Sequence, residues 1–530
     1  MYLFRRGLQC GDGGHAAAHL GIEMRQGARY SGQGGILYMD NIITEPFAPG
    51  TMGSKRFRIP SIITTKKNKI VAACDARWSH GLDSAGNLET VTAISKDGGR
   101  SWERQFVNHF DDVEDGSERC IFSAGFIDPI MGEDSQGNLY LLADLCPAFV
   151  GAYAVDGVVC GQQNGGRHPN GRLALKDGES YFHGEPLELD EETYPYYVGE
   201  PEEDGYLPVL RLKDGGPYED YVLDDEMYLY RRRESGVERV MIPQLNGQGE
   251  PTAHKIHANI FFAASPVKAY PSFHIVCRVS QDEGRTWSKL TFVSEQIGGR
   301  GFTAVCPGRG YSYWHEGKER MLFPIYDNNL GVEFAGVIYT EDLGVTWKRG
   351  KRARETGFRQ NGDYVKSSES QIVGMPDGSL RMFSRNLIQE ITYTDSRDGG
   401  ETWSAYKREP QLHYCGNCMV SVINYSRRIE GRPVLLASYP QGDGVPYHRM
   451  NGVIAVGLVD EGTGEVDWKY HYPVNQAPFY YSCLTELPDG KVLLWYEYEE
   501  YAIRCGVYTI EELLGLGKKD IGNKEVDDGV

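Results

Sequence analysis

The residue types that could do chemistry first occur together in the stretch between Phe57 and Asp83. Arg58 and Arg77 lie 19 residues apart, each at one end of a β-like run, and Asp83 follows six residues after Arg77. The planar guanidinium group of an arginine matches both oxygens of a carboxylate, and a carboxylic acid on a nearby loop can protonate a leaving group. The stretch therefore predicts an anion site beside a proton donor. The alternative is two surface arginines and a solvated aspartate.

The composition favours a chain of many short strands joined by turns. Its 530 residues include 34 Tyr, 65 Gly and 25 Pro, and 12% of them are aromatic. Aromatic residues are enriched in strands, and glycine and proline are enriched in the turns between them. A chain of this length can bury a large core and form roughly two to four domains.

The charge balance narrows the range of partners. The formal net charge is −19, so nucleic acid and anionic membranes are poor partners for the surface as a whole. Several arginines that converge locally could still bind an anion. The sequence has no apolar run of 18 residues and no signal-peptide core. We therefore expect a soluble protein, either cytoplasmic or exported through a signal outside this chain.

The 11 cysteines have no disulfide-framework spacing. Cys74 and Cys277 lie in apolar runs, where a thiol behaves as a small hydrophobic group. Cys415 and Cys418 form a lone CxxC pair, without a second pair at the spacing of a zinc site. Packing is the favoured interpretation of this pair, and metal binding or redox chemistry is the alternative.

The most specific pattern is an eight-residue motif, S/T-x-D-x-G-x-S/T-W, which occurs four times. Its copies span residues 95–102, 280–287, 340–347 and 396–403. In each copy the aspartate can accept backbone N–H bonds and the glycine tolerates a positive φ, which predicts a hairpin corner. The motif lacks the further acids of a calcium-binding EF-hand loop.

The spacing of the copies predicts the fold. The last three copies begin 60 and 56 residues apart, near the roughly 40–50 residues of a four-stranded propeller blade. The first gap is 185 residues and includes a turn-rich stretch that is dense in tyrosine and acids. We interpret that stretch as an insertion, and we predict an all-β protein, a six-bladed β-propeller with a small inserted β domain.

The predicted domain boundaries follow from this plan. Residues 1–50 form a lead-in with one strand near 36–38, residues 51–148 the first part of the propeller, residues 149–265 the inserted β domain, residues 266–515 the remainder of the propeller, and residues 516–530 a frayed tail. Near the end, Thr509 and Glu512 have the spacing of a helix capping box.

The sequence resembles a known family. An F-R-I-P start at Phe57, an acid 25 residues after Arg58 and the repeated Asp-box turns are together similar to the bacterial exo-α-sialidases, or neuraminidases, of glycoside hydrolase family 33. The resemblance covers about residues 50–510 and is greatest to the large Gram-positive type. That type has a sialidase-fold propeller with an inserted β domain between early blades.

The family's motifs imply the catalytic residues. The glutamate of an E-S-Q strand matches Glu369, which precedes Arg385 by 16 residues, and the nucleophilic tyrosine of a Y-S-x-L motif matches Tyr481. Glu497 matches the acid that steadies the first arginine, Arg58.

The remaining family positions are matched less directly. The third arginine that binds the substrate carboxylate corresponds here to Arg449, chosen over three other candidates: Arg427, Arg428 and Arg432. Arg77 and Asp128 resemble the residues that hold the sugar's 4-hydroxyl group.

The implied roles agree with the chemistry of sialic acid, whose carboxylate lies on the anomeric carbon itself. The three arginines would bind this carboxylate and orient the ring. A carboxylate nucleophile, as in ordinary retaining glycosidases, would face the substrate's own negative charge. The neutral phenol of Tyr481 would avoid this repulsion, and Glu369 could take the proton of the phenol. Asp83 would protonate the leaving oxygen and then activate water, so hydrolysis should retain configuration.

The leading hypothesis is an exo-α-sialidase that hydrolyses terminal sialic acid from glycoproteins, glycolipids and oligosaccharides. The first alternative is an intramolecular trans-sialidase that releases 2,7-anhydro-sialic acid behind an aromatic wall, for which Tyr498 and Tyr501 are candidates. The second alternative is a non-catalytic propeller that binds sialic acid.

The hypothesis also sets the expected cofactors and surroundings. It requires no metal or organic cofactor, because acid, base and nucleophile are all side chains. We expect a monomer without a nucleic-acid partner or membrane insertion. The resemblance implies a location outside the cell or at its surface, and a cytoplasmic location stays open.

Overall fold

The structure, a computed structural model, describes most of the chain. The described residues are 42–78, 83, 86–114, 121–151, 159–160, 166–178, 189–298, 302–329, 332–353, 359–360, 363–364, 367–499 and 502–516. The strand predicted near residues 36–38 lies outside these residues, as do most of the lead-in and the tail after residue 516.

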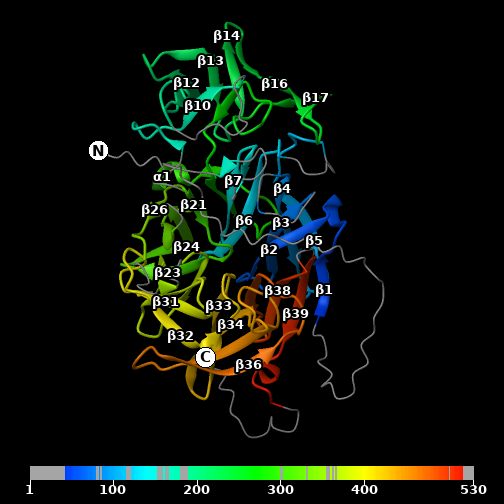
Figure 1. Cartoon of the computed structure of the whole chain (residues 1–530), viewed down its shortest axis with the longest axis vertical. Coiled ribbons are helices and arrows are strands. Elements are labelled where there is room, and N and C mark those ends of the chain that lie inside the picture. Colours follow the sequence, from blue (N-terminus) through cyan, green and yellow to red (C-terminus); the bar gives the residue numbers. More distant parts are fainter. Residues whose placement is uncertain are drawn as a thin grey trace, which may run out of the picture.

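Six antiparallel sheets of the described part form the blades of a propeller, which confirms the predicted all-β, six-bladed fold (Figure 1). Blade 1 contains β2 (Arg56–Thr64), β3 (Ile70–Arg77), β4 (Leu88–Ser95) and β5 (Glu103–Asn108). Blade 2 contains β6 (Gly125–Glu133), β7 (Leu139–Cys146), β19 (His274–Ser280) and β20 (Thr291–Phe292), and β22 (Gly308–Arg309) adds to it in parallel with β6. Blade 3 contains β21 (Phe302–Val305), β23 (Tyr311–His315), β24 (Lys318–Asn329), β25 (Val332–Thr340) and β26 (Lys348–Arg349).

The later blades complete the ring. Blade 4 contains β29 (Ser370–Gly374), β30 (Leu380–Ser384), β31 (Glu390–Ser396) and β32 (Lys407–His413). Blade 5 contains β33 (Ser421–Ile429), β34 (Arg432–Pro440), β35 (Gly452–Val459) and β36 (Val466–Pro473). Blade 6 contains β37 (Ser482–Glu486), β38 (Val492–Tyr498), β39 (Ala502–Tyr508) and β1 (Ile42–Phe47). Because β1 pairs with β39, a strand from early in the chain closes the ring.

The middle strands are buried because each blade packs between two neighbours. Every residue of β3, β4, β7 and β35 is buried, and β3, β7 and β35 are accordingly made mostly of apolar residues. Phe57 of blade 1 and Trp495 of blade 6 belong to one hydrophobic cluster. The first and last blades therefore hold each other through side chains as well as through β1.

The four repeated motifs join the third strand to the fourth strand in blades 1 to 4. In the copy of blade 4, the carboxylate of Asp398 accepts hydrogen bonds from the hydroxyl of Ser396 and the backbone N–H of Thr402, both at 2.8 Å. Gly400 has a φ of 90°, which other residues rarely adopt. These contacts confirm the predicted hairpin corners.

The chain leaves blade 2 after β7 and returns to it with β19. Between them lies a seven-stranded sheet of β15 (Gly236–Arg239), β14 (Leu229–Arg233), β13 (Pro217–Leu223), β12 (Leu207–Arg211), β11 (Tyr196–Val198), β10 (Ala174–Asp177) and β18 (Val267–Ala269), in this order, with a hairpin of β16 (Met241–Leu245) and β17 (Pro251–His257). This inserted sheet lies at the top in Figure 1. Leu229 and Val267 share a hydrophobic cluster with Phe126 and Leu145 of blade 2, so the insertion packs on that blade.

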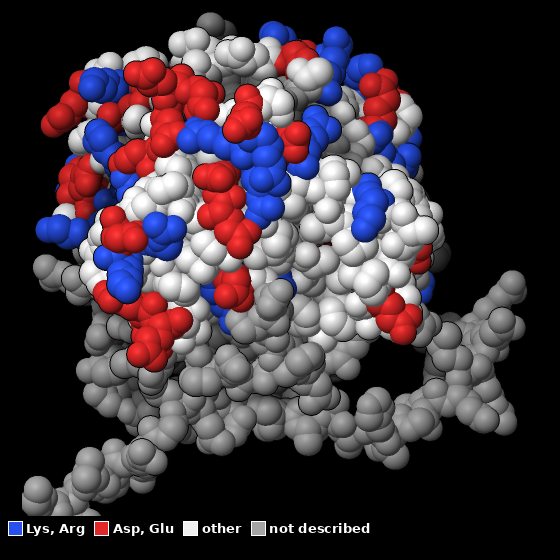
Figure 2. Space-filling view, turned by 90° about the horizontal axis from the view of Figure 1, so that it is seen from above, with Lys and Arg blue, Asp and Glu red and all other residues white. Residues whose placement is uncertain are grey.

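The outer face of the inserted end carries both signs of charge. Figure 2, seen from above, shows basic and acidic side chains next to one another on this face. The ion pairs of the inserted sheet include Arg231 with Glu219, and Arg232 with Asp204 at 2.8 Å. Such interspersed charges favour solubility and make a weak surface for a polyanion.

Short elements complete the described part: η1 (Thr51–Gly53), β8 (Val150–Gly151), β9 (Val159–Cys160), α1 (Ser294–Ile297), β27 (Arg359–Gln360), β28 (Asp363–Tyr364) and α2 (Ile510–Leu513). The predicted capping box of α2 is confirmed, because Thr509 and Glu512 each accept the other's backbone N–H through their side chains. Among the described helices, none has the length and apolar character needed to cross a membrane.

Candidate active site

Four of the predicted site residues lie at one end of the first two strands of their blades. In blade 4, Glu369 precedes β29 and Arg385 follows β30, and the N–H of Arg385 donates to the carbonyl of Glu369 at 2.9 Å. In blade 6, Tyr481 precedes β37, and the N–H of Glu497 on β38 donates to the carbonyl of Tyr481 at 2.9 Å. The two 16-residue spacings therefore reflect the same hairpin register in two blades.

Blade 1 carries a strained bulge at the same position. The pairing of β2 with β3 shifts between Arg58 and Ser61, and Ile59 has a φ of 61°. A β-branched residue keeps this conformation only where its surroundings hold it. Glu497 does so, because its Oε1 atom accepts the N–H of Ile59 at 2.6 Å, while its Oε2 atom lies 3.3 Å from Nη2 of Arg58. Glu497 thus steadies both the bulge and the first arginine.

Two guanidinium groups hold Asp83. Its Oδ1 atom accepts hydrogen bonds from Nη1 of Arg77 at 2.6 Å and from Nη1 of Arg58 at 3.2 Å. Burial alone would raise the pKa of Asp83, but the charges of Arg77 and Arg58 outweigh burial and hold that pKa well below its usual range. The side chain of Asp83 is 38% exposed. Asp83 is therefore an ionised carboxylate that a substrate can reach.

The phenol of Tyr481 lies between a carboxylate and an arginine. Its hydroxyl donates to Oε1 of Glu369 at 2.5 Å and accepts from Nη1 of Arg385, also at 2.5 Å. Burial raises the pKa of Tyr481 well above its ordinary value; the charge of Arg385 opposes this shift and the charge of Glu369 adds to it. The hydroxyl is therefore a neutral phenol, already bonded to a group that could take its proton.

The three arginines predicted to bind a carboxylate converge on Tyr481. The guanidinium carbon of Arg58 lies 5.7 Å from the centroid of the Tyr481 ring and that of Arg449 lies 5.2 Å from it, while Arg385 bonds to the hydroxyl. The alternatives for the third arginine have partners elsewhere: Arg427 the carbonyl of Asp489, Arg428 the carboxylate of Glu461, and Arg432 the carbonyl of Leu458. Three guanidinium groups around one phenol can bind an anionic group next to a reacting carbon.

Comparisons with known proteins identify the family. A family model described as a BNR repeat-like domain matches residues 249–494. The crystal structure of the intramolecular trans-sialidase of Ruminococcus gnavus, in complex with oseltamivir carboxylate, is 30% identical in sequence and superposes with a TM-score of 0.75, over 90% of this chain and 99% of that one. The chain belongs to the sialidase family.

Two curated relatives agree with this assignment. The anhydrosialidase of Macrobdella decora is 31% identical over 520 residues, and sialidase B of Streptococcus pneumoniae is 28% identical over 473 residues. The matches cover 90% and 84% of this chain but 63% and 62% of the relatives. This sialidase-family chain therefore spans less than two thirds of the length of the curated relatives it matches.

Asp128 lies at the same site, on the inner strand of blade 2. Strand β6 has the same kind of bulge as β2. Asp128 has a φ of 60°, precedes a proline and lies where the pairing with β7 shifts. Its N–H donates to Oδ1 of Asp75 at 3.2 Å. Burial, and then the neighbouring charge of Asp75, raise the pKa of Asp128 well above its usual range. A protonated carboxyl can both donate to and accept from a sugar hydroxyl.

Sequence analysis missed Asp75, which lies behind Arg77. Its Oδ2 atom accepts from Nη2 of Arg77 at 2.8 Å, and both side chains are fully buried. Burial raises the pKa of Asp75 to about 7, against the opposing charge of Arg77. The spacing of two residues on one strand could have revealed this pair, because residues i and i+2 face the same side.

Sequence analysis also missed Asn417, which lies within the CxxC pair. Its side-chain oxygen accepts hydrogen bonds from Arg385, and its backbone carbonyl accepts one from Arg449. The residue types around Asn417 carry no sign of these contacts, since one of them uses only the backbone.

The flanking thiols of Cys415 and Cys418 are both buried and free. A hydrogen bond between them raises the pKa of Cys415. Burial would raise the pKa of Cys418 as well, but the bond from Cys415 and the charge of Arg449 lower it. Across the described residues, no group of three or more His, Cys, Asp or Glu side chains could hold a metal ion. Packing stays the favoured interpretation of this pair.

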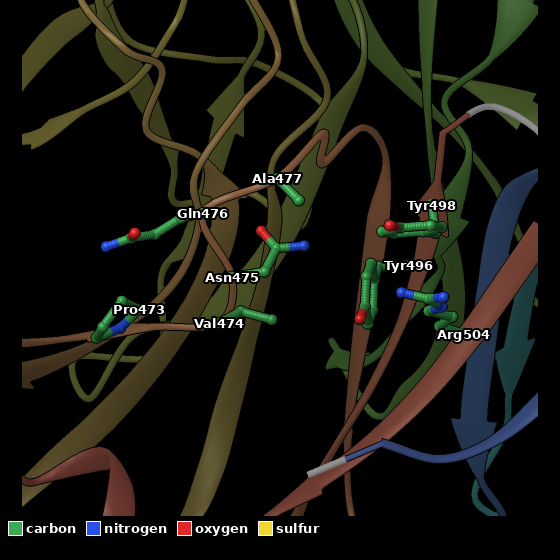
Figure 3. Close-up of a pocket in the computed structure, with 8 residues that line it drawn as sticks. All are labelled: Pro473, Val474, Asn475, Gln476, Ala477, Tyr496, Tyr498 and Arg504. Atoms are coloured by element: carbon green, nitrogen blue, oxygen red, sulfur yellow. The ribbon is translucent and has the colours of Figure 1, made fainter. Parts of the chain in front are cut away.

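A cavity of about 260 Å³ lies between the end of β36 and strands β38 and β39 (Figure 3). Its walls are formed by Pro473, Val474, Asn475, Gln476, Ala477, Tyr496, Tyr498 and Arg504. Tyr498, one candidate for an aromatic wall, lies here with its ring centroid 3.3 Å from the guanidinium carbon of Arg504. The other candidate, Tyr501, lies outside the described residues.

Proposed function

We propose that this chain is an exo-α-sialidase that cleaves terminal sialic acid from glycoproteins, glycolipids and oligosaccharides. The observation that carries the proposal is the Tyr481 phenol, which is bonded to Glu369 and surrounded by three guanidinium groups. A neutral sugar gives no reason for three cations around the nucleophile. A sugar with a carboxylate on its anomeric carbon does, because each guanidinium can donate to that carboxylate.

The first step forms a bond between the sugar and the protein. The three arginines bind the carboxylate and direct the anomeric carbon toward the hydroxyl oxygen of Tyr481. As this oxygen bonds to the anomeric carbon, its proton passes to Glu369 and the bond from that carbon to the glycosidic oxygen breaks. Asp83 gives a proton to the departing oxygen.

This step requires a protonated Asp83, whereas Arg77 and Arg58 hold Asp83 ionised in the free protein. Arg58 belongs both to this carboxylate's surroundings and to the arginine cluster around Tyr481. When a substrate carboxylate binds to Arg58, its negative charge offsets that of the guanidinium and raises the pKa of Asp83. The substrate itself thus brings about the protonation that its leaving group needs.

The second step releases the sugar. Asp83 takes a proton from water as the water oxygen bonds to the anomeric carbon, the bond to the Tyr481 oxygen breaks, and Glu369 returns its proton to that oxygen. Two successive displacements at one carbon leave its configuration unchanged. Hydrolysis would therefore release the sugar with retained configuration.

A second candidate is an intramolecular trans-sialidase that releases 2,7-anhydro-sialic acid. The names of two relatives favour it: the intramolecular trans-sialidase of Ruminococcus gnavus and the anhydrosialidase of Macrobdella decora, at 30% and 31% identity. In this reaction the sugar's own 7-hydroxyl oxygen bonds to the anomeric carbon in place of water, and Asp83 takes its proton. The first step and its residues are the same.

Mass spectrometry of the products from α2,3- and α2,6-linked sialosides tests both candidates. Free sialic acid supports hydrolysis, and a product lighter by one water supports internal transfer. Tyr481→Phe should abolish both products. The proposal fails if the wild-type protein releases neither product, or if Tyr481→Phe turns over sialosides as fast as the wild type.

A further inference from the structure

Asn417 holds two of the three arginines from a single position. Its Oδ1 atom accepts hydrogen bonds from Nε of Arg385 at 3.2 Å and from Nη2 of Arg385 at 2.8 Å. Its backbone carbonyl accepts a hydrogen bond from Nη2 of Arg449 at 2.9 Å. One residue thus fixes the distance between two guanidinium groups that come from different parts of the chain.

The turn that carries Asn417 is itself held firmly. The N–H of Asn417 donates to the carbonyl of Asn386 at 2.8 Å, and the N–H of Cys415 donates to the carbonyl of Pro440 at 3.0 Å. The side chains of Cys415 and Cys418, on either side, are 1% and 0% exposed. The turn is therefore anchored to blades 4 and 5 at once, which makes it a rigid support for the arginines.

The backbone of Asn417 explains why this residue type suits the position. Its φ is 51°, in the left-handed region that asparagine, aspartate and glycine adopt most readily. Among these three, glycine has no side-chain acceptor and aspartate adds a negative charge beside a site for an anion. Asparagine alone combines this backbone with a neutral acceptor for Arg385.

The other partners of Arg385 cannot replace Asn417. Its Nη1 atom bonds to Glu369 and to the hydroxyl of Tyr481, both of which change protonation in the proposed reaction. Asn417 is neutral and binds the opposite side of the guanidinium through Nε and Nη2. It can therefore hold Arg385 in place while the proton of Tyr481 moves.

We propose that Asn417 is a positioning residue that sets the carboxylate-binding geometry of Arg385 and Arg449. The inference rests on the proposed sialidase function and adds to it the residue that positions two arginines for binding of the substrate carboxylate. Arg58 has its own support in Glu497, so loss of Asn417 should weaken the clamp without removing it.

Asn417→Gly is the variant that tests this role. Glycine keeps the left-handed backbone and the carbonyl that serves Arg449, and it removes only the acceptor for Arg385. Asn68→Gly is the matched control, because Asn68 also has a positive φ, 64°, but is exposed in the turn between β2 and β3. Both proteins should fold, which circular dichroism and thermal unfolding check.

The decisive measurement compares two unsaturated sialic-acid analogues that differ only in carrying a carboxylate or a carboxamide. Loss of a hydrogen bond to a charged group predicts an affinity for the carboxylate about tenfold or more lower in Asn417→Gly, with a much smaller change for the carboxamide. In turnover, KM should rise more than kcat falls. Asn68→Gly should match the wild type in every value.

The outcomes separate this inference from the proposed function. An active wild-type protein together with an unchanged carboxylate-to-carboxamide affinity ratio in Asn417→Gly overturns the inference alone. A wild-type protein that neither turns over sialosides nor binds the carboxylate analogue overturns both. If Asn417→Gly does not fold, Asn417→Asp replaces it: the added negative charge beside Arg385 should lower the same affinity ratio, and an unchanged ratio overturns the inference.

Discussion

The two halves of the site differ in how much of the chemistry is ready before a substrate binds. In the half built by blades 4 to 6, the hydroxyl of Tyr481 already donates a hydrogen bond to Glu369 at 2.5 Å. In the half built by blades 1 and 2, Asp83 lies between Arg58 and Arg77 with its pKa held low. In the proposed reaction, the half with Tyr481 (the nucleophile half) is therefore prepared by the protein alone, whereas the half with Asp83 (the acid half) starts in the wrong protonation state.

The difference follows from which charges each half faces. Glu369 offsets Arg385 in the nucleophile half, so a neutral phenol and an ion pair coexist there. In the acid half, Arg58 and Arg77 both face Asp83, and an added anion at Arg58 can reduce their effect on the pKa of Asp83. In the proposed reaction, Arg58 would bind the substrate carboxylate and thus also set the pKa of Asp83. A site for an anionic sugar can in this way keep its acid ionised until the sugar arrives.

The largest expected effect comes from breaking the nucleophile half. Tyr481→Phe removes the attacking oxygen and Glu369→Gln removes the base, so kcat should fall by about 10³-fold or more in each variant. The loss should be similar for natural sialosides and for aryl sialosides, because both need the attack on the anomeric carbon. Steady-state kinetics with both substrates gives the two ratios. Near-normal turnover of the aryl substrate by Tyr481→Phe would contradict a preset nucleophile.

Substitution of Asp83 in the acid half should lower kcat to different extents for the two substrates. Asp83→Asn cannot protonate a leaving group, so kcat for sialyllactose should fall by about 10²- to 10⁴-fold. A methylumbelliferyl group leaves without a proton, so the same variant should lose less than about tenfold when the first step is measured with this substrate. Equal losses with both leaving groups would show that Asp83 does not act as the acid.

The coupling between the two halves can be measured as the uptake of protons when a carboxylate analogue binds. Above its low pKa, Asp83 is ionised in the free protein. A carboxylate analogue that binds Arg58 raises this pKa, so binding takes up a fraction of a proton, and affinity weakens as pH rises. Calorimetry in buffers of different ionisation enthalpy measures the uptake. Asp83→Asn should abolish it, and equal uptake in that variant would place the titrating group elsewhere.

How far the fold could be predicted depends on which blades contain a copy of the repeated corner motif. Blades 1 to 4 each join their third and fourth strands through the Asp-box motif, so the sequence shows four repeats. Blade 5 turns at Asp460 without the tryptophan, and blade 6 takes its outer strand from β1. Blade 5 is built of consecutive hairpins without the repeated motif, and blade 6 is completed by pairing between β1 and β39, which lie far apart in the sequence, so no local motif marks either blade.

The site divides in the same way. Glu369 with Arg385, and Tyr481 with Glu497, keep a fixed spacing because one hairpin register sets it, and motif matching could therefore place them. The contact of Asn417 with Arg449 uses a backbone carbonyl, so no residue type reveals it. The low pKa of Asp83 depends on Arg58, which only the folded blade brings near. The sequence could therefore predict which residues come together at the candidate site, whereas their protonation and their supporting contacts depend on the assembled ring.

The smallest expected effect concerns the Asp-box corners at the outer rim of the propeller, which occur in blades of both halves. Asp398 lies in the corner of blade 4, and Asp97 lies in the corresponding corner of blade 1. Each accepts bonds from a serine hydroxyl and from a backbone N–H. Asp398→Ala or Asp97→Ala should therefore lower the free energy of unfolding by about 1–2 kcal/mol, as measured by urea unfolding, with kcat unchanged for both substrates.

The pH dependence of that loss has a definite sign. Burial opposes the shift, but the bonds from Thr402 and Ser396 lower the pKa of Asp398 below its ordinary value. A group with a lowered pKa stabilises the fold above the ordinary pKa of aspartate, about 4, and loses this contribution as pH falls below it. The difference in unfolding free energy between wild type and Asp398→Ala should thus shrink as the pH falls below about 4. If Asp398→Ala instead slowed turnover of natural but not aryl sialosides, the rim would reach the acid half, and the separation between the two halves would not hold.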